Sequence, residues 1–125
     1  MLSKAPLYAY IPAGDIDRAR RFYEEKLGFK PKLTPGGVVY EFGKGTAAFL
    51  YATPNAGTSK ASQAFWQVKD IERLVADLKG RGIRFEDYGE LPDMKREGSV
   101  YSGGGASAAW FKDTEGNIMA LIESD

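Results

Sequence analysis

Hydrophobic residues recur along the chain at two different spacings, which separate the expected helices from the expected strands. Within residues 16–27 the apolar side chains return every three or four positions, the period of one helix face. Asp15 stands where a side chain can accept hydrogen bonds from the first free N–H groups, and Gly28 where the last turn can close in a left-handed conformation. The pattern predicts a helix over 15–28.

Short apolar runs on both sides of this helix predict strands. Residues 7–13 are aromatic and aliphatic and stop at Gly14, as a strand would. After the helix we expect an irregular strand and then a hairpin joined at 43–45, with strands at 29–33, 38–42 and 46–52. Residues 53–62 are small, polar and rich in turn formers, which favours a linker.

The same order of elements returns after the linker. We expect a strand over 63–68 and a helix over 70–82, followed by an extended segment over 84–88. Residues 89–105 are rich in glycine and charge, and their length predicts a lid or binding loop. Two final strands are expected around a turn at 113–116, over 108–112 and 117–123.

A sequence repeat supports this second copy. Asp15-Ile-Asp-Arg18 returns as Asp70-Ile-Glu-Arg73, 55 positions later, and each copy follows a short apolar strand. The alternative is a chance similarity between two amphipathic helices. The matching order of elements favours one α+β domain over 1–125, built from two βαβββ modules at 1–56 and 61–125.

The composition excludes several kinds of chemistry. The 125 residues include 17 Lys and Arg, 17 Asp and Glu, no histidine and no cysteine, for a formal net charge of +0. Without cysteine and histidine the chain has no disulfide, no thiolate and no imidazole to act as a base or metal ligand. A balanced charge gives no electrostatic basis for nucleic-acid binding. The function must depend on carboxylates, hydroxyls, amides and aromatic rings.

Secretion and membrane insertion are not indicated. Residues 1–6 lack the charged start and long apolar run of a secretory signal, and no stretch approaches the ~20 apolar residues of a membrane span. The lack of cysteine fits a reducing compartment. We expect a cytoplasmic protein without a membrane partner.

Three segments together resemble the vicinal oxygen chelate superfamily, which contains glyoxalase I, bleomycin-resistance and fosfomycin-resistance proteins, and extradiol dioxygenases. The segments are 11–29, 65–73 and 110–118, and the last is similar to the family's Phe-x-Asp-Pro-x-Gly-Asn turn with Thr114 in place of proline. The resemblance implies paired modules whose sheets curl into a cup around a pocket. It also implies a homodimer and, in the metal-dependent members, a divalent ion in the cup.

The family's metal-ligand positions hold unsuitable residues in this chain. By the resemblance they fall on Tyr8, on Gln63, on Ala120 and on Leu50 or Tyr51. Only Gln63 could coordinate an ion in the ordinary way, and one neutral amide does not hold a transition metal. Substitute ligands from Glu41 or Glu123 remain the alternative. We expect no metal and no cofactor, as in the metal-free branch whose members sequester drug-like molecules.

Strand alternation indicates which side chains line the cup. Residues two apart share a face, and the parity of the ligand positions selects the inward face. Tyr101, in the long loop, and Trp110, whose direction is open, complete the predicted set of ligand-binding residues: Tyr8, Tyr10, Phe49, Tyr51, Gln63, Phe65, Gln67, Tyr101, Trp110 and Ala120. Trp66 should face away from the cup. This set is aromatic and mostly uncharged, as small-molecule pockets usually are.

Three functions remain open at this point. The first is a metal-free homodimer that binds or sequesters a hydrophobic or aromatic small molecule. The second is a glyoxalase-like lyase or isomerase with an atypical or absent metal site. For this one no spacing singles out a catalytic residue among Glu41, Glu86, Asp87 and Glu123. The third is a structural dimer whose cup is filled by its own side chains.

Overall fold

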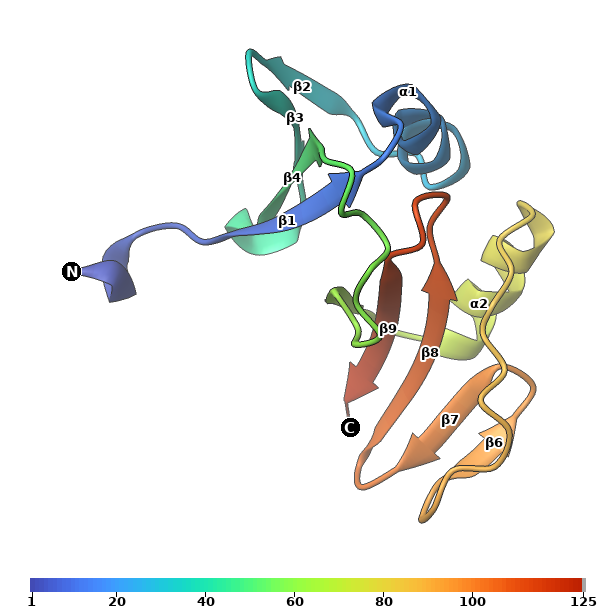
Figure 1. Ribbon diagram of the computed structural model, residues 1–125. Helices are drawn as coiled ribbons and strands as arrows, with labels where there is room; N and C mark the ends of the chain where they lie inside the picture. Colours follow the sequence, from blue (N-terminus) through green and yellow to red (C-terminus); the bar gives the residue numbers. More distant parts are fainter. Residues whose placement is uncertain (125) are drawn as a thin grey trace.

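The computed structural model describes residues 1–124, which form two sheets, one from each half of the chain (Figure 1). The first sheet has the order β1-β4-β3-β2, with β1 parallel to β4 and the other pairs antiparallel. Its strands are β1 (Tyr8–Ala13), β2 (Pro31–Thr34), β3 (Gly37–Glu41) and β4 (Ala47–Ala52). The short helices η1 (Leu2–Lys4) and η3 (Gly43–Gly45) precede β1 and join β3 to β4.

The second sheet repeats this arrangement with one more strand. Its order is β5-β9-β8-β7-β6, again with the first strand parallel to the last and the other pairs antiparallel. The strands are β5 (Ala64–Gln67), β6 (Lys95–Glu97), β7 (Val100–Gly103), β8 (Ala106–Lys112) and β9 (Ile118–Ser124). The two sheets and their few helices confirm the predicted α+β fold.

The helix of each half begins where the repeat predicted it. Helix α1 (Ile16–Arg20) continues with wider, π-helical turns as η2 (Arg21–Lys26), and Gly28 follows with a φ of 76°. The Asp15 carboxylate accepts a hydrogen bond from the Arg18 N–H at 3.1 Å, as expected of an N-terminal cap. Helix α2 (Ile71–Gly80) begins differently, because Glu123 on β9 accepts hydrogen bonds from the N–H groups of Asp70 and Ile71.

The prediction of one long loop over 89–105 is wrong. This segment contains the hairpin β6–β7, which turns at Gly98 with a φ of 61°. Strand β6 is Lys-Arg-Glu, and charged residues are common at the exposed edge of a sheet. Because it contains no hydrophobic residue, a hydrophobicity pattern does not predict this strand. The expected extended segment 84–88 pairs with the sheet only through a bridge from Phe85 to Phe111.

An aromatic cluster joins the two halves of the chain. Trp66 of β5 packs against Phe29 and Phe42 from the first half at ring-centroid distances of 5.7 Å each. It also stacks on Phe111 of β8 at 6.3 Å with an angle of 11° between the rings. Trp66 therefore faces away from the predicted cup, as its strand parity predicted.

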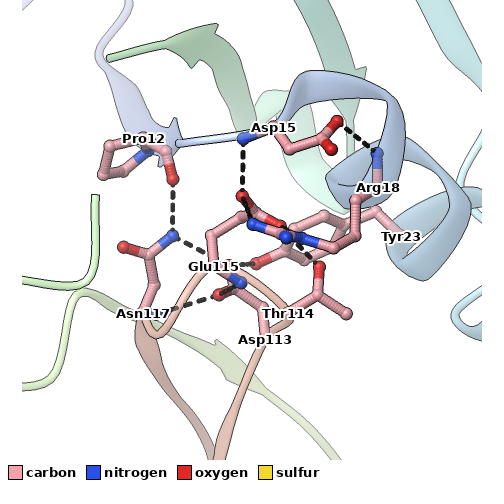
Figure 2. Close-up of polar contacts among 8 residues, drawn as sticks. All are labelled: Pro12, Asp15, Arg18, Tyr23, Asp113, Thr114, Glu115 and Asn117. Carbon is pink, nitrogen blue, oxygen red and sulfur yellow. Dashed lines mark hydrogen bonds and ion pairs between the residues drawn. The ribbon is translucent and has the colours of Figure 1, made fainter. Parts of the chain in front are cut away.

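The turn between β8 and β9 reaches the end of β1 and the start of α1 (Figures 1 and 2). Glu115 accepts hydrogen bonds from the Asp15 N–H at 2.8 Å and from Nε and Nη2 of Arg18 at 2.8 and 2.9 Å. Its side chain has no exposed surface. Burial alone would raise the pKa of Glu115, but hydrogen bonds from Arg18, the Asp15 N–H and Thr114 lower this pKa to about 2.

Two further side chains of the turn make contacts on the same side. Asp113 accepts a hydrogen bond from the buried Tyr23 hydroxyl of η2, and Asn117 donates one to the Pro12 carbonyl at 2.7 Å. The segment that resembles the family's turn motif therefore binds the second sheet to the strand and helix of the first. These contacts fix how the two sheets lie relative to each other.

Candidate functional site

The first sheet has one face that is mostly buried and an opposite face that carries aromatic side chains. Ile11 and Leu50 point into the core with no exposed surface. On the opposite side, the Tyr10 ring lies 4.7 Å from Tyr51 and 6.1 Å from Phe49, measured between centroids. Tyr10 is 60% exposed although it belongs to this aromatic group.

Two glycines leave the space that Phe49 occupies. A side chain at Gly37 would place its Cβ 3.0 Å from the Phe49 ring and 2.1 Å from the Leu50 carbonyl oxygen. At Gly36 the corresponding distance to the Phe49 ring is 3.5 Å. The Phe49 ring therefore lies over a glycine pair, and Gly37 is the position where a side chain would not fit without a shift of its neighbours.

The second sheet carries its own aromatic face. Strand register places Phe65, Ala120 and Trp110 in one row across β5, β9 and β8. The neighbouring row on this face runs through Gln67, Ile122, Ala108, Tyr101 and Arg96. The register settles the open direction of Trp110, which shares a face with Phe65 and Ala120.

Gln63 links the edges of the two sheets. Its side-chain Nε2 donates a hydrogen bond to the Tyr10 carbonyl at 3.3 Å, across the free edges of β1 and β5. The two positions that the resemblance aligns with metal ligands on the first strands, Tyr8 and Gln63, therefore lie at neighbouring strand edges.

The predicted site residues differ in how accessible they are. Five are exposed, three are half-buried and two are buried: Tyr8, Tyr10, Gln63, Phe65 and Gln67 are exposed, Phe49, Tyr51 and Trp110 half-buried, and Tyr101 and Ala120 buried. The Tyr101 hydroxyl is occupied internally, since it accepts a hydrogen bond from the Tyr88 N–H and donates one to the Gly89 carbonyl. Tyr101 therefore supports the site rather than lining it.

The sequence pattern missed Tyr88 beside Trp110 and the contact between Arg96 and Tyr101. Tyr88 packs edge-on against Trp110 with 5.5 Å between ring centroids, and Arg96 lies over the Tyr101 ring at 5.3 Å. Asp87 pairs with Arg96 through a contact of 2.6 Å. The only signal in the sequence was an aromatic residue beside Gly89, within a segment predicted to be extended.

The acidic residues that could replace metal ligands are engaged elsewhere. Glu123 caps α2, and Glu41 lies 4.0 Å from Lys32. Leu50 and Ala120 offer no donor atom. Among residues 1–124, no three Asp or Glu side chains gather as an ion would require. The donor set does not fit the divalent ion of the family's metal-dependent members.

The candidate bases for catalysis are also paired. Hydrogen bonds from Arg96 and the Gly89 N–H lower the pKa of Asp87, and hydrogen bonds from the N–H groups of Ile71 and Asp70 lower that of Glu123. Glu86 lies 3.6 Å from Lys112. A carboxylate with a lowered pKa is a weaker base, so this arrangement does not favour proton abstraction by either Asp87 or Glu123.

Two shallow hollows on the surface lie away from the aromatic faces. One follows the exposed side of α1 and η2 from Asp17 to Glu25, and another lies between α2 and the β6–β7 hairpin. Neither is lined by Tyr8, Tyr51 or Gln63. On the aromatic faces Tyr10 and Phe65 are exposed, whereas Tyr101 and Ala120 are buried.

No helix within residues 1–124 is both long and apolar enough to cross a bilayer.

Solved structures with the same fold include proteins of different activity. The chain superposes on a glyoxalase family protein from Enterococcus faecalis with a TM-score of 0.71 at 20% identity, covering 98% of this chain and 100% of that one. For TnmS3, an antibiotic binding protein from Streptomyces sp. CB03234, the TM-score is 0.68 at 20% identity, with 100% and 99% covered. For lactoylglutathione lyase from Agrobacterium tumefaciens the TM-score is 0.67 at 18% identity, with 96% and 93% covered. At these identities the likeness shows the fold alone.

A search of curated proteins gave no match. The family model described as the Glyoxalase/Bleomycin resistance protein/Dioxygenase superfamily matches residues 6–121, which is nearly the whole chain. The chain therefore belongs to the glyoxalase/bleomycin resistance protein/dioxygenase superfamily.

Proposed function

We propose that this chain is a metal-free member of its superfamily that binds an aromatic or otherwise hydrophobic small molecule on its inward faces. The observation that carries the proposal is the contrast across β1. Ile11 is completely buried on one side of the strand, whereas Tyr10 on the other side is 60% exposed. Phe65 on β5 is 59% exposed in the same way. Leaving such rings in water costs hydrophobic free energy that a bound ligand would recover.

The polar groups near these rings suit an uncharged ligand. Tyr8, Tyr10 and Tyr51 contribute hydroxyls, and Gln63 and Gln67 contribute amides, among mostly apolar neighbours. Small-molecule sites usually combine an apolar lining with a few such groups that orient the ligand. TnmS3, an antibiotic binding protein of the same fold, is a precedent for binding on this scaffold.

A second copy of the chain would complete the site. The family resemblance implies a homodimer, and the two inward faces of this chain are open on the side away from their core. We propose that the cup closes when faces of two chains come together around the ligand. Sedimentation velocity would then show a dimer, and a monomer at micromolar concentration would contradict this part of the proposal.

Elemental analysis and activity assays test the metal-free assignment. The purified protein should contain no stoichiometric transition metal and should not convert a hemithioacetal substrate. Stoichiometric Zn²⁺ or Ni²⁺ that is lost in Gln63→Ala would contradict the proposal. Turnover that a chelator abolishes would select the glyoxalase-like alternative, and turnover that survives the chelator would indicate a metal-free enzyme.

A further inference from the structure

We propose that Tyr88 is a ligand-contacting residue, and that it forms with Trp110 a fixed aromatic corner that selects uncharged planar ring systems. This inference rests on the proposed function and deepens it by naming the ligand class and a residue that sets it. Tyr88 stands outside the set of residues expected to line the cup.

The two rings form an open corner. The Tyr88 ring meets Trp110 at 5.5 Å between centroids with an angle of 64° between the ring planes. Tyr88 remains 41% exposed. Trp110 belongs to the inward face through its row with Ala120 and Phe65. A flat ligand can therefore stack on one ring and meet the edge of the other, which are the two favoured geometries for aromatic pairs.

The backbone on either side of Tyr88 is held in place by hydrogen bonds. The Tyr101 hydroxyl, which has no exposed surface, accepts a hydrogen bond from the Tyr88 N–H at 2.9 Å and donates one to the Gly89 carbonyl at 3.1 Å. The Glu86 N–H donates to the Trp110 carbonyl at 2.7 Å. Gly89 has a φ of 68°, which lets the chain turn at this point. An exposed tyrosine is thus fixed by a buried one.

The charges beside the corner neutralise each other. Asp87 accepts hydrogen bonds from Arg96 Nη1 at 2.6 Å and from the Gly89 N–H at 2.8 Å. The Arg96 guanidinium lies over the Tyr101 ring and donates through Nε to the Gly98 carbonyl at 2.8 Å. Because both charges have partners, neither is left to attract an ion of opposite sign. This arrangement favours an uncharged ligand at the corner.

Two probes with the same number of carbon atoms separate stacking from simple hydrophobic binding. The planar probe is 2-naphthalenemethanol, and the rounded, saturated probe is 1-adamantanemethanol. Isothermal titration calorimetry measures both with the full-length protein. An aromatic pair is worth roughly 0.5–1.5 kcal/mol beyond its buried area, so Tyr88→Ala should weaken binding of the planar probe by up to about tenfold. Binding of 1-adamantanemethanol should change by less than about threefold, and Tyr88→Phe should bind both like wild type.

Tyr101→Phe tests whether the hydrogen bonds of the Tyr101 hydroxyl hold Tyr88 in position. It removes a hydroxyl that cannot touch a ligand, yet it should weaken binding of the planar probe because the segment that carries Tyr88 loses two hydrogen bonds. The matched control is Tyr23→Phe, which removes another fully buried hydroxyl, the one bound to Asp113. Tyr23→Phe should lower stability without changing the ratio of the two affinities.

The outcomes separate this inference from the proposed function. If wild type binds 2-naphthalenemethanol and Tyr88→Ala binds it equally well, the corner is wrong and the proposed function stands. If Tyr88→Ala weakens both probes alike, the selection of planar rings is wrong. If wild type binds neither probe, both the proposed function and this inference are wrong.

Discussion

Trp66 and Trp110 lie on opposite faces of the second sheet. Trp66 shares a strand-register row with Leu121 and Ala109, and Trp110 shares the next row with Phe65 and Ala120. The first packs against Phe29 and Phe42 from the other half of the chain, whereas the second lies beside the exposed Tyr88. We therefore expect the fluorescence of Trp110 to respond to ligand binding and that of Trp66 to respond to unfolding.

Single-tryptophan variants should separate ligand binding from the contact between the halves. In Trp66→Phe, the remaining Trp110 should be quenched by a planar ligand. In Trp110→Phe, the remaining Trp66 should respond to unfolding and change little on ligand addition. Fluorescence titration with a planar ligand that quenches on contact and does not absorb at the tryptophan emission, and urea unfolding monitored on the same variants, check both statements. Equal quenching in the two variants would contradict this division.

Trp66→Ala should lower the free energy of unfolding by about 2 kcal/mol, because the half-buried indole packs against the core and its removal leaves part of that packing unfilled. The variant loses the contacts of Trp66 with Phe29 and Phe42, which join the two halves of the chain. Phe65→Ala is the matched control on the neighbouring residue of β5, and since Phe65 is 59% exposed it should cost less than about 1 kcal/mol. Urea unfolding measures both, and similar losses would place Trp66 outside the core.

Glu115→Gln should lower the free energy of unfolding at neutral pH. In the variant this free energy should also depend less on pH. The pKa of Glu115 is about 2 in the folded protein against an ordinary value of 4.5, so the carboxylate stabilises the fold above pH 4.5. This contribution, on the order of 2–3 kcal/mol, is lost as the pH falls from 4.5 toward 2. The difference in unfolding free energy between wild type and variant should therefore shrink over this interval. A difference that is constant with pH would contradict the assigned role of the carboxylate.

Glu123→Gln tests whether this residue caps α2 or serves as a replacement metal ligand. Since Glu123 accepts hydrogen bonds from two N–H groups at the start of α2, the variant should lose about 1 kcal/mol of stability. Its metal content and its affinity for 2-naphthalenemethanol should equal those of wild type. Thermal unfolding and elemental analysis are the measurements. A loss of bound metal in the variant would support the alternative in which Glu123 is a ligand.

The sequence predicted the parts of this fold that follow a regular period. The repeat around Asp15 and Asp70 located both helices, and alternation along β1 placed Tyr8 and Tyr10 on the face opposite Ile11. It failed at β6, because an exposed edge strand of Lys-Arg-Glu carries no hydrophobic pattern. The capping role of Glu123 was also hidden, since it depends on a contact between residues about fifty positions apart.

The candidate site was predictable only to the level of a face. Alternation gives the direction of a side chain but not its burial, so Phe65 and Ala120 could not be distinguished, although the first is exposed and the second buried. Tyr88 lies in a segment without regular pairing, where no period applies. The position of its backbone depends on two hydrogen bonds with the Tyr101 hydroxyl, one accepted from the Tyr88 N–H and one donated to the Gly89 carbonyl, which only the folded chain shows.

We propose that the aromatic faces of the two sheets bind a planar ligand without a metal. The most direct test is calorimetric titration of the wild-type protein with 2-naphthalenemethanol, before and after dialysis against a chelator. The account predicts saturable binding with the same Kd in both states. Binding that disappears after the chelator, or no saturable binding in either state, would contradict it.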